Sequence, residues 1–264
     1  MSNSKSHADL LFEQYLLSQC MRDFEYEKDW KMDGITTHPD YSVVHEGSTY
    51  IFEVKELDPK TPFSGFSFSD PYKNIRAKIK KVGYRNQLKP FKGRFPCCLV
   101  LWSNDDPRQL LDPFRMGGAM YGDIGFRVYF DSETGESVGK DSEVVFNTRG
   151  KMFAPGNKQT QNTTISALIS LSVYPTGQLW ETLNGQIDST ELRKMNLFQT
   201  NDTNLVVPGV SIWENEFAEL PFPREIFNGP FDHRYIVEGG YFKPHKMGKA
   251  WEIIQSMKTV GAGA

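Results

Sequence analysis

The sequence predicts one α/β domain in which a mixed central sheet is flanked by helices. The apolar run of residues 97–103 is typical of a central strand that is buried on both faces. Residues 41–45 and 49–55, rich in β-branched and aromatic side chains, predict a hairpin before it. Amphipathic segments at 6–24 and 71–88 lie on either side of this hairpin in the sequence. At 264 residues the chain is long enough for one large core.

Residues 6–24 predict the first helix. Ser6 and Asp9 form a plausible capping pair at its start. A spacing of 100° per residue centres one helix face on Glu13. The apolar residues that flank it are Leu10, Leu16, Leu17, Cys20, Met21 and Phe24. A carboxylate on an apolar face is costly unless it is paired or bound to a metal, so we expect Glu13 to have a partner.

The hairpin brings charged residues together. Glu46-Gly47 fits a two-residue turn, which pairs His45 with Ser48 and places Asp40 opposite Glu53. Cross-strand neighbours have Cβ atoms about 5 Å apart, close enough to share one ion. Because side chains alternate along a strand, Lys55 lies on the same face as Glu53. We therefore expect Asp40, Glu53 and Lys55 on one surface.

Residues 71–88 predict the second helix, with Asp70 as N-cap and Pro71 at the first helical position. Ile75, Ile79 and Val82 form its apolar stripe. From residue 72 to 94 the chain has many bases and no acid. These bases are Lys73, Arg76, Lys78, Lys80, Lys81, Arg85, Lys89, Lys92 and Arg94. A charge run is usually a solvated helix face, but like charges this dense repel, which favours an anionic partner.

The second half of the chain is less legible. Strands are predicted at 126–130 and 143–146 around an acidic turn, and a buried strand at 164–174. A short helix is predicted near 249–257. We see no repeat or linker, so residues 1–264 are predicted to form a single domain. Its motif-bearing core is about 6–103, and about 176–264 forms a C-terminal extension.

The clustered acids and lysine fit phosphodiester hydrolysis. Mg²⁺ or Mn²⁺ takes a few protein oxygens and keeps several waters, so Asp40, Glu53 and the Val54 carbonyl would suffice as ligands. Glu13 would reach the ion directly or through water. Lys55 would orient or help to deprotonate the attacking water and stabilise negative charge. The basic helix would then follow a phosphate backbone.

These residues carry a resemblance to a known family. Pro39-Asp40 followed by Glu53-Val54-Lys55, after a helix with Glu13 and before a second helix, resembles the PD-(D/E)XK nucleases of the restriction-endonuclease-like fold. The resemblance implies an αβββαβ core, a metal site at Asp40, Glu53 and Val54, and a catalytic role for Lys55. It also implies an accessory acid at Glu13 and a polar residue near the site at Gln87. It covers residues 6–103 and the 164–174 strand.

The predicted function is therefore a Mg²⁺- or Mn²⁺-dependent endonuclease that acts on DNA, in restriction, defence or repair. The residues expected to contact nucleic acid are Lys78, Lys81, Arg85, Gln87 and Lys89. Action as a homodimer and action with a partner subunit both stay open. A non-catalytic module that binds nucleic acid or protein is the alternative, and a hydrolase of small phosphoesters is a third interpretation.

Composition narrows the setting. The net charge of −3 gives the protein no overall positive potential that would attract a polyanion, so any nucleic-acid-binding surface must be local. The three cysteines show no metal-ligand spacing, which favours reduced thiols and a cytoplasmic protein. No apolar run approaches the ~20 residues that span a bilayer, and the N-terminus lacks the apolar core of a signal peptide, so no membrane partner is expected.

Overall fold

The computed structural model describes most of the chain. The described residues are 4–30, 38–57, 72–84, 87–103, 110, 112–122, 124–127, 131–136, 143–146, 150–154, 159–175, 198–199, 205–238 and 241–249. The predicted helix cap at Asp70 and Pro71, the base Arg85 and nearly all of the predicted 249–257 helix lie outside these ranges.

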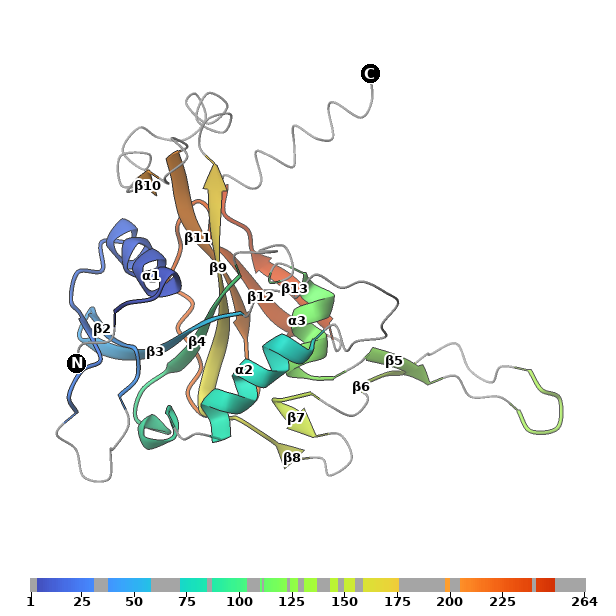
Figure 1. The fold of residues 1–264 in the computed structure, drawn as a ribbon. Helices are drawn as coiled ribbons and strands as arrows, with labels where there is room; N and C mark the ends of the chain where they lie inside the picture. Colours follow the sequence, from blue (N-terminus) through green and yellow to red (C-terminus); the bar gives the residue numbers. More distant parts are fainter. Residues whose placement is uncertain are drawn as a thin grey trace, which may run out of the picture.

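The described part is an α/β protein with one large mixed sheet, three α-helices and a short 3₁₀ helix, η1 (Figure 1). The helices are α1 (His7–Ser18), α2 (Lys73–Tyr84), η1 (Lys89–Phe91) and α3 (Pro113–Met120). The strands are β1 (Phe24–Tyr26), β2 (Tyr41–His45), β3 (Ser48–Glu56), β4 (Cys97–Trp102), β5 (Ile124–Arg127), β6 (Glu143–Phe146), β7 (Phe153–Ala154), β8 (Gln159–Thr160), β9 (Ile165–Pro175), β10 (Phe198–Gln199), β11 (Leu205–Glu214), β12 (His233–Glu238) and β13 (Tyr241–Lys246).

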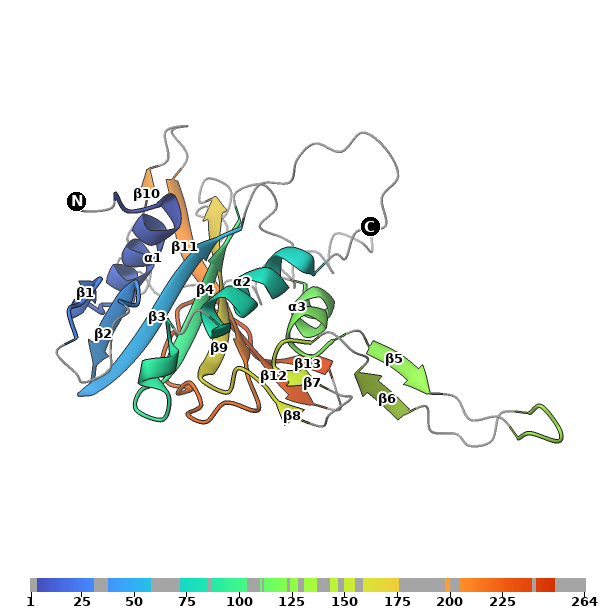
Figure 2. The same ribbon diagram turned by 60° about the horizontal axis from the view of Figure 1, so that its bottom comes forward.

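The main sheet has the strand order β1-β2-β3-β4-β9-β11-β12-β13, and β10 pairs with β11. β3 and β4, β4 and β9, and β11 and β12 run parallel, whereas the other pairs are antiparallel. The predicted extension thus supplies four strands of the same sheet, β10 to β13. β5 and β6 form a separate two-stranded arm that projects from the body (Figures 1 and 2).

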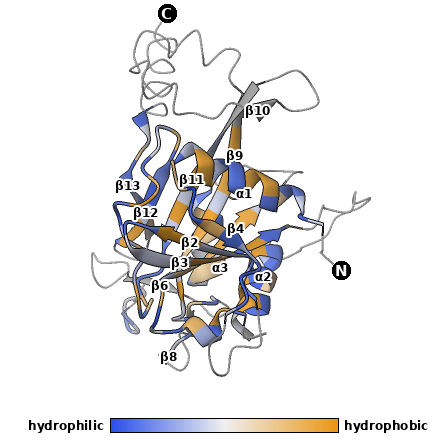
Figure 3. Ribbon diagram, turned by 90° about the vertical axis from the view of Figure 1, so that its left-hand side faces the viewer, coloured by the Kyte–Doolittle hydropathy of each residue, from blue (hydrophilic) through white to orange (hydrophobic). Residues whose placement is uncertain are grey.

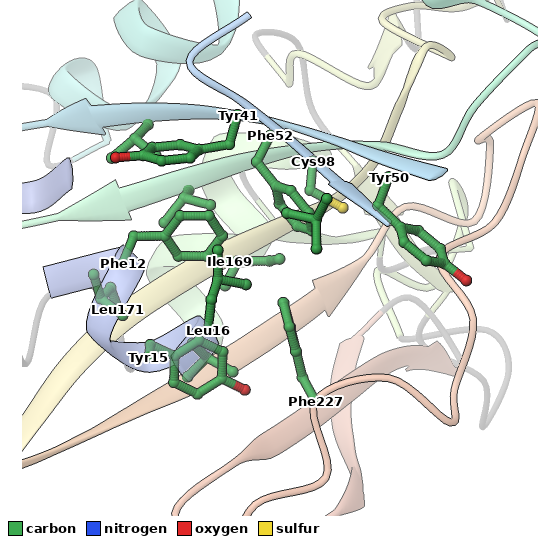
Figure 4. Packing of buried hydrophobic residues seen from close by; sticks show 14 of the residues in the cluster. Phe12, Tyr15, Leu16, Tyr41, Tyr50, Phe52, Cys98, Ile169, Leu171 and Phe227 are labelled. Atoms are coloured by element: carbon green, nitrogen blue, oxygen red, sulfur yellow. The ribbon is translucent and has the colours of Figure 1, made fainter. Parts of the chain in front are cut away.

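The helices cover opposite faces of the sheet. α1 packs on one face with Tyr41, Phe52 and Val54, where aromatic rings dominate the core (Figure 4). α2 and α3 pack on the other face, where Ile51 and Leu99 point. All of β4 is buried, as its apolar run predicts, and Figure 3 shows apolar residues along the central strands. The predicted stripe on α2 is also confirmed, since Ile75, Ile79 and Val82 are buried; the helix ends at Tyr84.

The first helix differs from the sequence prediction in length and in its buried face. The Ser6–Asp9 capping box is present, but α1 ends at Ser18 and Phe24 begins β1. Leu10 is 48% exposed, whereas Leu11 and Tyr15 are buried, so the predicted apolar face is wrong. The reason is that packing against β3 and β11, and not periodicity over a longer segment, selects the inward face.

The remaining predicted strands are present with shifted limits. For the strand predicted at 126–130, β5 begins earlier, at Ile124, and residues 128–130 lie outside the described ranges. β6 and β9 match their predicted positions closely. Among the described residues, no helix is long and apolar enough to cross a bilayer.

Candidate metal and catalytic site

The β2–β3 hairpin sets the register that the sequence predicts. Glu46 and Gly47 have φ values of 49° and 77°, the left-handed backbone that a tight two-residue turn requires. His45 pairs with Ser48 and Tyr41 pairs with Phe52, so the next step places Asp40 opposite Glu53. The predicted register is confirmed.

The side chains of Asp40, Glu53 and Lys55 meet. Lys55 Nζ lies 3.1 Å from Asp40 Oδ2 and also forms an ion pair with Glu53 Oε1. The backbone N–H of Val54 donates to the same Asp40 Oδ2, at 2.7 Å. The geometric prediction that two acids and a lysine share one surface is therefore confirmed, whereas their chemical role is a separate question.

Glu53 is the most buried member of this acid pair and lysine. Its side chain is 0% exposed, against 18% for Asp40 and 17% for Lys55. Glu53 Oε1 pairs with the Lys55 ammonium, and a hydrogen bond from the backbone N–H of Asp40 also favours the charged form of Glu53. Buried carboxylates usually have several donors, so this one is short of partners.

Burial and mutual charge shift the acid–base properties of all three groups. Burial and the charge of Asp40 raise the pKa of Glu53 to about 7, although the Lys55 charge offsets part of the rise. Burial also raises the pKa of Asp40, against the opposing effects of Lys55 and the Val54 N–H. Burial alone would lower the pKa of Lys55, but the charges of Glu53 and Asp40 outweigh it and raise that pKa.

The Val54 carbonyl is the third oxygen predicted for a metal. Within a strand, the N–H and C=O of one residue point to the same side. The Val54 N–H faces Asp40, on the side where β2 has already ended because its first residue, Tyr41, pairs with Phe52. The Val54 carbonyl therefore faces the same open edge, with no β2 residue to bond.

Glu13 is not brought to this acid pair. It lies on α1, which covers the opposite face of the sheet, and it accepts a hydrogen bond from Tyr41 Oη at 3.0 Å and pairs with Lys5. Among the described residues, no three His, Cys, Asp or Glu side chains are grouped closely enough to hold a metal. Glu13 thus has the partners that its position demanded, but they are Tyr41 and Lys5.

Sequence reasoning missed the electrostatic role of Asp9. The carboxylate of Asp9 accepts from Ser6 N at 2.8 Å and Ser6 Oγ at 2.6 Å, as expected of a cap. Its charge also contributes to the raised pKa of Asp40. The available signal was its position one turn before Glu13, on the same side of the helix.

The predicted nucleic-acid residues divide by position. Lys81 on α2 and Lys89 on η1 are exposed, whereas Lys78 and Gln87 are half-buried and Gln87 follows the end of α2. Arg76, part of the basic run, is buried and its guanidinium donates to the Gly118 carbonyl on α3 at 2.6 Å. Arg76 therefore joins two helices and does not belong to the surface charge.

Comparison with known proteins adds no family assignment. No protein-family model, no curated protein and no solved structure matches the chain.

Proposed function

We propose that this protein is a metal-dependent nuclease that hydrolyses phosphodiester bonds in DNA. The observation that carries the proposal is the meeting of Asp40, Glu53 and Lys55 at the open end of the hairpin. The order α1, β1, β2, β3, α2, β4 also supports it, because this is the αβββαβ order that the resemblance to PD-(D/E)XK nucleases implies.

The oxygens at this site suit Mg²⁺ or Mn²⁺. Asp40, Glu53 and the Val54 carbonyl would hold the ion, and all are hard oxygen donors of the kind these ions prefer. The fit rests on Glu53, a fully buried carboxylate that pairs with the Lys55 ammonium and lies beside a second acid, Asp40. When bound, such a metal lowers the pKa of a coordinated water and polarises a phosphoryl oxygen.

Lys55 would act on the reacting atoms. Its ammonium contacts both acids, so it would lie near a water or phosphate oxygen bound at this acid pair. It would donate hydrogen bonds that align the attacking water and would stabilise negative charge on the phosphate. Exposed Lys81 and Lys89 would contact the phosphate backbone outside the site.

The test is cleavage of several nucleic acids by the purified protein with Mg²⁺ or Mn²⁺. Supercoiled, linear and single-stranded DNA and RNA should be compared, with EDTA as the metal-free arm. We expect DNA products from the wild type and none from Asp40→Asn or Lys55→Met. Glu56→Gln is the matched control, because Glu56 is an exposed acid beside Lys55 on β3. Equal cleavage by Asp40→Asn would overturn the proposal.

A binding module without catalysis is the second candidate. The observation that favours it is that the Lys55 ammonium already pairs with both acids. It predicts DNA binding that weakens with salt, persists in EDTA and yields no product with any metal. The same experiment therefore separates the two functions.

A further inference from the structure

The Lys55 ammonium serves as a counter-ion shared by the acid pair. It contacts Asp40 Oδ2 and Glu53 Oε1 at once, so one positive charge bridges two carboxylates. Both donors to Asp40, Lys55 Nζ and Val54 N, use Oδ2, and neither uses Oδ1. The acid pair is thus held together by a cation that the chain itself supplies.

A divalent ion held by both carboxylates would lie beside this ammonium. Glu53 is fully buried, and Lys55 is the cation that pairs with it. A divalent ion on Asp40 and Glu53 would lie against the ammonium, and like charges at contact distance in a partly buried site repel strongly. Lys55 retains 17% side-chain exposure, so its side chain borders solvent.

We propose that Lys55 is a built-in competitor of the metal, whose ammonium must leave the acid pair when a divalent cation binds. This inference rests on the proposed function and concerns the control of that same site. Metal binding and the movement of the Lys55 ammonium away from the two acids are then coupled. The displaced ammonium becomes available to the water and phosphate only when the metal is bound, so the metal-free site stays closed.

The test is direct metal binding by calorimetry, without any activity readout. Ca²⁺ and Mn²⁺ should be titrated into the full chain near pH 8.5, above the pKa of about 7 of Glu53. We expect Lys55→Met to bind the metal about tenfold more tightly than the wild type, or better, because the competing charge is gone. Lys243→Met is the matched control: it removes an ion-paired lysine on β13, at the far edge of the sheet, and should leave affinity unchanged.

The outcomes separate this inference from the nuclease proposal. If the wild type binds metal and Lys55→Met binds it equally tightly or more weakly, the competitor role is overturned and the nuclease proposal still stands. No binding by either protein overturns both. If Lys55→Met does not fold, nitrogen-15 NMR spectra of the lysine side chains in the wild type test the same inference. When Mg²⁺ binds, the Lys55 ammonium should lose its hydrogen bonds to the acids, and its resonance should shift or broaden. A Lys55 resonance that stays unchanged at saturating Mg²⁺ overturns the inference.

Discussion

Two buried carboxylates in this molecule have opposite surroundings. Asp232, which follows the loop after β11, accepts hydrogen bonds from Tyr15 Oη at 2.9 Å, Val210 N at 3.1 Å and Gly229 N at 2.5 Å. Glu53, as buried as Asp232, has the Lys55 ammonium and the Asp40 backbone N–H as partners and a second acid beside it.

The difference separates a structural carboxylate from a candidate ligand. Burial raises the pKa of both, but three donors limit the rise for Asp232 to about 6, whereas Glu53 reaches about 7 with the repulsion of Asp40. Asp232 joins α1 to β11 and the loop before β12, so the fold uses its full bonding capacity. Glu53 has unused acceptor capacity, which is what a metal ion requires.

The largest expected effect is on catalysis. If the nuclease proposal holds, Glu53→Gln should lower the cleavage rate by about three orders of magnitude, because the amide lacks the charge of the proposed metal ligand. Asp232→Asn should instead leave the rate of the folded molecules nearly unchanged and lower the stability by about 1–3 kcal/mol, since a buried donor loses its acceptor. Rates with Mg²⁺ and urea unfolding curves measure the two effects. A comparable loss of catalysis in both variants would contradict the distinction between a structural Asp232 and a metal-binding Glu53.

The next effect is on the pH dependence of metal binding. Metal binding needs ionised Glu53, so apparent affinity should fall by about tenfold per pH unit below the pKa of about 7. The rise in melting temperature caused by Mn²⁺ should therefore be larger at pH 8 than at pH 6, and absent in Glu53→Gln. Thermal unfolding with and without Mn²⁺ measures it; an equal rise at both pH values would contradict it.

The folding stability of the metal-free protein should change with pH in the opposite direction to its metal affinity. Folding raises the pKa of Glu53 from its usual 4.5, so the folded state binds more protons than the unfolded state between about pH 4.5 and 7. Stability therefore falls as the pH rises through that window. Asp232 acts in the same direction, with a pKa raised to about 6, so Glu53→Gln should remove only part of the slope.

The smallest expected effect concerns the surface charge. Lys81→Ala or Lys89→Ala should weaken DNA binding a few-fold and reduce the slope of log affinity against log salt by about one each. Binding titrations between low and moderate salt measure the slope. Lys243→Ala, on the edge strand β13, is the control and should leave the slope unchanged. Unaltered slopes for Lys81 and Lys89 would remove both residues from the interface.

Much of the site could be predicted from local sequence because its geometry is local. The Glu46-Gly47 turn and the alternation of side chains along β3 determine which residues face Asp40. Glu13 could not be placed in this way. Its position depends on which face of α1 packs against the sheet, and that face was misjudged because the helix ends at Ser18.

The pairing of the outer strands could also not be predicted from the sequence. β11 pairs with β9 and β12, which requires partners distant along the chain that no local pattern specifies. The buried role of Arg76 illustrates the same limit. Its charge marks it as a surface residue, and only the approach of α3 gives its guanidinium a carbonyl partner.

The hairpin turn has a consequence for how this protein can change. Residues 46 and 47 are separated from Asp40 by the five residues of β2, roughly 17 Å of extended chain. One residue inserted or deleted in that loop would slide β2 against β3, and Asp40 would then meet a neighbour whose side chain points into the aromatic core under α1. The two-residue turn, far from the acid pair, thus determines which residue of β3 lies opposite Asp40.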